Sequence, residues 1–315
     1  MKLKRGIYLG VLCLAVVLLI SSIASAGLLD WFKKVTGQAT TQPTNVSITV
    51  SGINPVTITI YNQSLPTSSV SNDGIGSMLL YVTITDPDGA ADINTTSVIA
   101  NFSKTGEVLR SNSSCIKVGN DLSATAQNYS CTINMYYYDA MGAWTINVGA
   151  KDFGNLTYYY NTTTIFSLSQ LQGIEIFPTT LTWTAVTPGD INKTSNNDPT
   201  LINNTGNYLS NLTINALNLH GITNTAQYIS VGNISVSNNT NANNMECSLT
   251  TATTLVNGTD TQIMNSNLTK GDHNAQNNQT GQEQLFYCFR TVPTSGISSQ
   301  TYSTSTTGSW SISLT

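Results

Sequence analysis

The chain has 315 residues, of which 40% are hydrophobic and only 9% are charged, and its formal net charge is −4. An ordinary soluble protein carries roughly 25% charged residues, so neutral polar side chains replace the missing charge here. Beyond the N-terminal segment, the few Lys and Arg residues are widely spaced except for Lys33-Lys34, which argues against a basic surface for nucleic acid. The length suffices for two domains of ordinary size.

The N-terminus predicts export. Residues 1–5 are basic, residues 7–20 form an apolar run, and Ala24-Ser25-Ala26 is an A-x-A processing site, so residues 1–26 read as a cleavable signal peptide. Two alternatives stay open. The apolar run could be retained as a membrane anchor, and Lys4-Arg5-Gly6 resembles the processing site of archaeal type IV pilin precursors.

Residues 27–44 combine a short amphipathic segment with a linker. Leu28, Trp31, Phe32 and Val35 would share one helical face, which suggests peripheral contact with a membrane surface. The alternative is a frayed end before a polar linker.

From residue 45 onward, Thr, Val, Ile and Tyr alternate in short runs separated by Gly, Pro, Asn and Asp, which is typical of strands. We therefore expect an all-β fold with two tandem immunoglobulin-like antiparallel β-sandwiches, over residues 45–170 and 171–315. The strands expected in the first sandwich cover residues 46–51, 56–61, 78–85, 97–102, 129–137, 144–150 and 156–166.

The strands expected in the second sandwich cover residues 181–186, 200–203, 208–217, 227–236, 246–249, 284–290 and 309–314. Residues 250–282 are rich in Asn, Thr and Gln. We expect this stretch to be a long polar loop that is mobile, carries glycans and contributes nothing to the core.

Two segments resemble a known class of surface protein. Residues 81–93, which contain Asp86-Pro87-Asp88-Gly89, and residues 144–155 resemble the repeats of prokaryotic immunoglobulin-like and cadherin-like cell-surface proteins. In the second half, Thr187-Pro188-Gly189-Asp190 and residues 203–207 are similar to sandwich modules of archaeal envelope and filament-forming proteins. The resemblance implies spacing and adhesion rather than chemistry.

Apart from Cys13 in the signal segment, the chain has Cys115, Cys131, Cys247 and Cys288, which allow three pairings. Pairing Cys115 with Cys131 and Cys247 with Cys288 keeps each bridge local and predicts an oxidising, extracellular location. A zinc site is the rival interpretation, but no CxxC spacing supports it.

Sixteen Asn-x-Ser/Thr sequons mark acceptor positions for glycans in an exported protein. They begin at Asn45, Asn62, Asn94, Asn101, Asn112, Asn128, Asn155, Asn161, Asn192, Asn203, Asn211, Asn233, Asn238, Asn257, Asn267 and Asn278. The alternative is a surface rich in Asn and Thr that is never modified.

Asp86, Asp88 and Asp92, together with Asp152, could gather carboxylates around a structural Ca²⁺ ion at one end of the first sandwich. The competing interpretation needs no ion, because Asp and Gly also form turns through hydrogen bonds to their own backbone. No other cofactor is expected.

The sequence predicts no enzyme. The only histidines, His220 and His273, lie in no catalytic motif, and no GxSxG, HExxH or phosphate-binding loop is present. Tyr136-Tyr137-Tyr138 and Tyr158-Tyr159-Tyr160 could form a platform for sugar rings, although alternation between core and surface is the simpler account.

Together these features predict a non-enzymatic glycoprotein of the cell surface with a structural or adhesive role in the envelope. Its expected partners are other envelope proteins or surface glycans. The alternatives are a subunit of an extracellular filament, in which the terminal strand completes the sheet of a neighbouring copy, and a polysaccharide-binding module.

Overall fold

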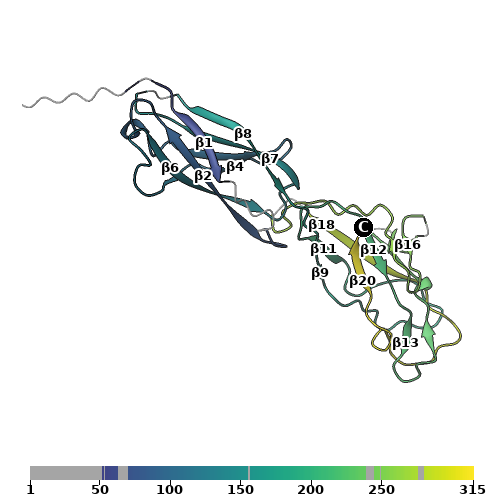
Figure 1. Ribbon diagram of the computed structural model, residues 1–315. Helices are drawn as coiled ribbons and strands as arrows, with labels where there is room; N and C mark the ends of the chain where they lie inside the picture. The colour runs from purple at the N-terminus through teal and green to yellow at the C-terminus, as the bar shows by residue number, and fades with distance from the viewer. Residues whose placement is uncertain are drawn as a thin grey trace, which may run out of the picture. The chain divides into compact units, whose positions relative to one another are not determined.

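Antiparallel strands make up nearly all the regular structure. A computed structural model describes residues 52, 54–62, 70–154, 157–238, 245–248, 250–275 and 280–315 (Figure 1). Within these ranges the only helical elements are three short 3-10 turns, so the predicted all-β class is confirmed. The predicted signal peptide, amphipathic segment and strand 46–51 lie outside the described residues.

The N-terminal lobe consists of β1 to β8 and contains two four-stranded antiparallel sheets, in the orders β1-β2-β6-β5 and β4-β3-β7-β8 (Figure 1). The strands are β1 (Thr57–Asn62), β2 (Ile75–Thr85), β3 (Ile99–Ser103), β4 (Arg110–Asn112), β5 (Ile116–Lys117), β6 (Ala126–Tyr136), β7 (Gly142–Ala150) and β8 (Tyr159–Leu168). The 3-10 turn η1 (Ala90–Asp92) lies between β2 and β3.

Alternation along these strands builds one core from both sheets. In β2 every second residue from Gly76 to Ile84 is buried, and β7 buries Trp144, Ile146 and Val148 in the same way. The buried apolar side chains of both strands, including Leu80 and Trp144, belong to one hydrophobic cluster. The alternation of apolar and polar residues in the sequence therefore indicates which side chains face this core.

The register of β2 against β6 fixes the turn that follows β2. Ile75 pairs with Tyr136 at one end, and Thr85 pairs with Ala126 at the other. Asp86 comes directly after the last pair, and its backbone N–H donates to Thr125 O at 2.8 Å. The sheet thus positions the backbone from which an acidic cluster is built.

The C-terminal lobe consists of β9 to β20 and has three sheets: β16-β15-β18-β11-β9, with β10 also paired to β18; β17-β12-β20; and β14-β13-β19. The strands are β9 (Ile174–Phe177), β10 (Ile191–Thr194), β11 (Thr200–Asn204), β12 (Leu212–Asn215), β13 (Leu219–Gly221), β14 (Tyr228–Ile229), β15 (Ile234–Ser237), β16 (Thr253–Thr254), β17 (Thr261–Gln262), β18 (Gln282–Thr291), β19 (Tyr302–Ser303) and β20 (Ser311–Leu314). The 3-10 turns are η2 (Val231–Asn233) and η3 (Met245–Cys247).

Several strand predictions for this lobe are wrong. Residues 181–186 form no strand; there Trp183 packs partly buried against the core and donates from Nε1 to Lys193 O at 3.1 Å. Residues 245–247 form η3 instead of a strand. Residues 227–236 split into β14, η2 and β15, because a hydrogen bond from Gly232 N to the Ser230 hydroxyl caps a turn in the middle.

The long polar segment is also not a core-free loop. Within residues 250–275, Leu255, Ile263 and Leu268 are at most 1% exposed and belong to the hydrophobic cluster of the C-terminal lobe. The strands β16 and β17 also lie in this stretch. Isolated apolar residues among many polar ones escape a search for periodicity, yet Leu255, Ile263 and Leu268 each fill part of the core.

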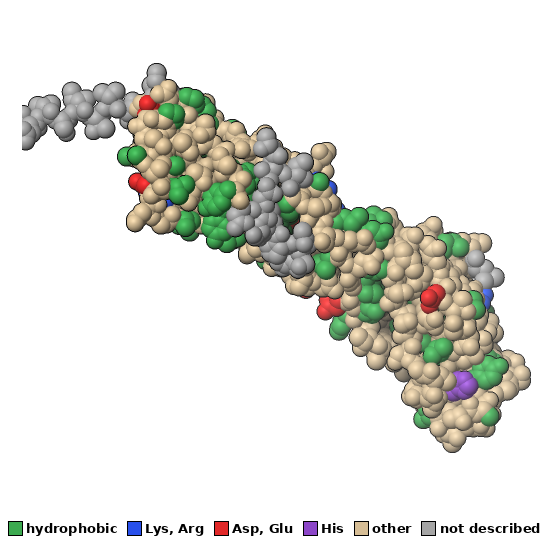
Figure 2. Space-filling view, viewed as in Figure 1, with side chains coloured by type: hydrophobic (Ala, Val, Ile, Leu, Met, Phe, Trp, Pro, Cys, Tyr) green, Lys and Arg blue, Asp and Glu red, His purple; other side chains and the backbone are tan. Residues whose placement is uncertain are grey.

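Each lobe has its own hydrophobic cluster, and all described residues belong to one compact unit, Ser51–Thr315. The number of domains and their immunoglobulin-like class therefore remain predictions. The face drawn in Figure 2 is dominated by uncharged polar side chains and backbone, with few Asp, Glu, Lys or Arg side chains. This agrees with the low charged fraction of the chain.

Candidate functional site: an acidic cluster after strand β2

The turn after β2 brings three carboxylates together. One carboxylate oxygen from each of Asp86, Asp88 and Asp92 lies within 4.8 Å of those of the other two. Asp88 N donates to Asp86 Oδ1 at 2.8 Å, and Gly89 N donates to Asp86 O at 3.1 Å. Gly89 has φ 130°, a conformation that L side chains rarely adopt, so glycine is required at this turn.

The segment before β1 closes over the cluster. Asn54 donates to Asp88 twice, from its backbone N at 2.9 Å and from Nδ2 at 2.8 Å. Gly52 N donates to Asp92 Oδ2 at 2.8 Å. A side chain at Gly52 would collide with the carboxyl group of Asp88, so glycine allows this close approach.

Asp152, the fourth predicted ligand, follows β7 and forms an isolated β-bridge with Ile93, next to Asp92. It is 0% exposed. Its charge reaches the cluster, since it is one of the carboxylates that raise the pKa of Asp86. Asp88, Asp92 and Asp152 therefore all act on Asp86, although only Asp86, Asp88 and Asp92 supply oxygens to the compact group.

Burial is the main cause of the raised pKa of Asp86. The hydrogen bond from Asp88 N lowers this pKa, whereas the charges of Asp92, Asp88 and Asp152 raise it. Asp86 Oδ2 is buried and has no hydrogen-bond partner among the described residues. A turn held only by its own hydrogen bonds therefore provides a donor for Asp86 Oδ1 but none for Oδ2.

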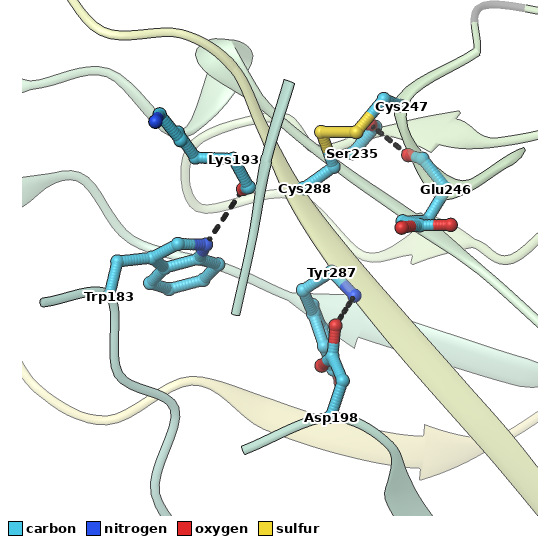
Figure 3. The surroundings of a disulfide bond; sticks show 8 residues. All are labelled: Trp183, Lys193, Asp198, Ser235, Glu246, Cys247, Tyr287 and Cys288. Carbon is cyan, nitrogen blue, oxygen red and sulfur yellow. Dashed lines mark hydrogen bonds between the residues drawn. A yellow bond between two sulfur atoms is a disulfide. The ribbon is translucent and has the colours of Figure 1, made fainter. Parts of the chain in front are cut away.

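Both predicted disulfides are present in the structure. Cys115 is bonded to Cys131, with their Cα atoms 4.5 Å apart, and Cys247 to Cys288, with their Cα atoms 5.2 Å apart. The first joins the residue before β5 to β6, and the second joins η3 to β18 (Figure 3). These bonds account for all four cysteines outside the N-terminal segment.

Two acids with raised pKa values, Glu246 and Asp198, lie near the second disulfide, and the sequence alone does not predict the burial of either. Glu246 is 0% exposed, and neither carboxylate oxygen has a partner among the described residues (Figure 3). Asp198 accepts hydrogen bonds from Ser195 Oγ at 2.6 Å and from Tyr287 N at 3.0 Å. Burial raises the pKa of both acids, and the charge of Asp198 further raises that of Glu246. Nothing in the local sequence distinguishes either acid from a surface residue.

Twelve of the sixteen sequon asparagines have described side chains, and none of the twelve is buried. Asn45, Asn62, Asn155 and Asn278 fall outside that description. Asn192, Asn257 and Asn267 are exposed, and the other nine are partly exposed.

The tyrosine triplets are largely engaged within the protein. Tyr137 is 4% exposed, and the rings of Tyr136 and Tyr138 stack on each other with centroids 5.3 Å apart. The Arg110 guanidinium lies over Tyr136 at 4.4 Å. In the second triplet Tyr160 is 54% exposed and stacks on Tyr158.

Both histidines belong to the C-terminal lobe, and each contacts different groups. His220 lies in β13, where its Nδ1 is 2.8 Å from Thr225 O and its ring stacks on Tyr228. His273 Nε2 lies 3.1 Å from Asp73 Oδ1. The absence of catalytic activity stays a prediction.

No protein-family model matches the chain, and no curated protein is significantly similar to it. No helix among the described residues is long and apolar enough to cross a membrane. The functional interpretation therefore depends on the chain's own residues.

Proposed function

We propose that this protein is an exported, non-enzymatic glycoprotein of the cell envelope, built from immunoglobulin-like sandwiches, with a structural or adhesive role. The observation that carries the proposal is the placement of the sequons: every one of the twelve with a described side chain lies outside the core. Such positions can accept a bulky hydrophilic sugar without disrupting the packing. Two disulfides support an oxidising location.

The sequons differ in the hydrogen bonds that the Asn Nδ2 atom, the glycan acceptor, already donates within the protein. In Asn112, Asn161, Asn203 and Asn238 the Nδ2 atom donates to a protein oxygen. Asn238 Nδ2 donates twice, to Asn265 O at 2.8 Å and to Glu283 Oε1 at 3.0 Å, so a glycan there would break an existing contact. We expect these four sites to carry less glycan than the exposed Asn192, Asn257 and Asn267.

The proposal is tested on protein isolated from its native source. Glycopeptide mass spectrometry measures occupancy at each sequon, and fractionation measures the share of the protein that stays with envelope material. Glycan at the exposed sites together with retention in the envelope is the expected result. Protein without glycan that runs as a free monomer and does not bind envelope material would remove the basis for the proposal.

Self-association into a filament is the second candidate function. The terminal strand β20 pairs antiparallel with β12, from Leu212 opposite Leu314 to Asn215 opposite Ser311, and β20 is the edge strand of its sheet. The same pairing could form between two chains if β20 left its own sheet. Electron microscopy of the concentrated protein tests this, and a field of separate monomers at every concentration argues against it.

A further inference from the structure

The acidic cluster contains a buried oxygen atom that the protein itself leaves without a donor. Asp86 is 0% exposed, and its Oδ2 has no hydrogen-bond partner among the described residues. An ionised carboxylate can accept about four hydrogen bonds, so a buried oxygen without a partner is unfavourable unless another group occupies its lone pairs. The lack of a donor for this buried oxygen indicates a ligand, independently of the gathering of acidic residues.

No cationic side chain neutralises the cluster in the described part of the chain. No ion pair there involves Asp86, Asp88 or Asp92. Lys151 precedes Asp152 in sequence, but its Nζ lies 4.3 Å from the centroid of the Tyr158 ring. The carboxylates therefore repel one another, and no lysine or arginine of the described ranges forms an ion pair that offsets the repulsion.

We propose that Asp86, Asp88 and Asp92 bind one Ca²⁺ ion, with Asp86 Oδ2 as the buried ligand. The group offers only carboxylate oxygens and no His or Cys, which favours a hard cation over zinc. Asp88 and Asp92 are already held by hydrogen bonds from Asn54 and Gly52. Ca²⁺ accepts irregular sets of six to eight oxygens and completes them with water, whereas Mg²⁺ requires a nearly ideal octahedron.

The ion would also order the chain just before β1. The carboxylates of Asp88 and Asp92 contact both the proposed ion and the backbone N–H groups of Asn54 and Gly52. Fixing these carboxylates fixes the acceptors of those two hydrogen bonds. Calcium is therefore expected to slow amide hydrogen exchange at Gly52 and Asn54, in addition to raising the melting temperature.

The test uses the oxidised full-length chain, freed of metal and titrated with CaCl₂ or MgCl₂, and it does not depend on glycans or on cellular location. Calorimetry measures stoichiometry, and thermal unfolding measures Tm. The Asp86→Asn variant keeps the size of the side chain and removes its charge. The matched control is Asp260→Asn, which removes one charge from an exposed residue in the C-terminal lobe.

The wild-type chain and D260N are expected to bind one Ca²⁺ and to gain the same increase in Tm, while Mg²⁺ has a weaker effect. D86N is expected to lose both the binding and the increase. If D86N does not fold, Asp92→Asn serves in its place. The proposal is overturned if the wild type binds no Ca²⁺ at about 10 mM, ten times the weakest dissociation constants of extracellular sites, or if a folded D86N or D92N variant binds as the wild type does.

Discussion

The guanidinium of Arg110 lies 2.5 Å from the carboxylate of Asp139, and both side chains are largely buried, at 14% and 1% exposure. Arg110 Nε is also within 3.1 Å of both carboxylate oxygens. Asp139 additionally accepts from Tyr136 N at 2.8 Å. One ion pair thus fastens β4 to the turn between β6 and β7.

We expect Arg110→Met to destabilise the protein by about 3–5 kcal/mol, because it leaves the buried Asp139 carboxylate without its cation. The double variant Arg110→Met/Asp139→Asn removes both charges and should recover much of this loss. Denaturant unfolding measures both. A loss below about 1 kcal/mol in R110M, the value typical of a surface pair, would show that the pair is not structural.

The polar segment after η3 offers a direct test of its role in the core. Leu268 is 0% exposed, so Leu268→Ala should cost about 2–5 kcal/mol through lost burial and the cavity that remains. Val256 lies in the same segment but is 51% exposed, and Val256→Ala should stay within about 0.5 kcal/mol. Equal effects of the two substitutions on the free energy of unfolding would contradict the placement of Leu268.

Strands whose buried and exposed residues alternate regularly are the ones that the sequence predicts. In β2 and β7 the alternation is regular, and both strands were predicted, although β2 begins three residues earlier than expected. The short strands β4 and β5 have only three and two residues, too few to show a period. In the C-terminal lobe the packing of Trp183 decides the path of residues 181–186, which no local propensity encodes.

The candidate sites were predictable to different degrees. The Asp86-Pro87-Asp88-Gly89 turn has recognisable chemistry, and the cysteine pairs followed from proximity along the chain. The contacts of Gly52 with Asp92 span 40 residues, and the burial of Glu246 depends on the surrounding tertiary structure. Neither can be read from a local pattern.

The disulfides should contribute unequal amounts of stability. They separate their cysteines by 16 and 41 residues. In the chain-entropy model such loops correspond to about 3 and about 4 kcal/mol. Replacing Cys115 and Cys131 by Ser, or Cys247 and Cys288 by Ser, and measuring unfolding against the oxidised wild type tests this; a double variant as stable as the wild type would contradict the expected contribution.

Stability should decrease as the pH rises above the ordinary pKa of a glutamate. Burial raises the pKa values of Glu246, Asp198 and Glu283 in the folded chain. A carboxyl with a raised folded pKa gives stability that is fully present below its unfolded value, 4.5 for Glu246, and lost as the pH passes through the folded value. The lowered pKa values of Asp121 and Asp190 act in the opposite direction, but only near and below 3.8.

The variant Glu246→Gln cannot ionise, so its unfolding free energy should fall less than that of the wild type as the pH rises above 4.5. The exposed Glu175 provides the control, since Glu175→Gln removes the same charge at the surface. Chemical unfolding at a series of pH values gives the slopes. A slope in E246Q identical to that of the wild type would exclude Glu246 as its source.

The central claim is that the chain works outside the cell as an oxidised glycoprotein, and the intact mass of the native protein tests it most directly. Non-reducing mass spectrometry, before and after enzymatic removal of glycans, should give a chain that begins at Gly27, lacks four hydrogens because of two disulfides, and loses sugar mass on treatment. A chain that still begins at Met1, with free thiols and no attached sugar, would contradict the account.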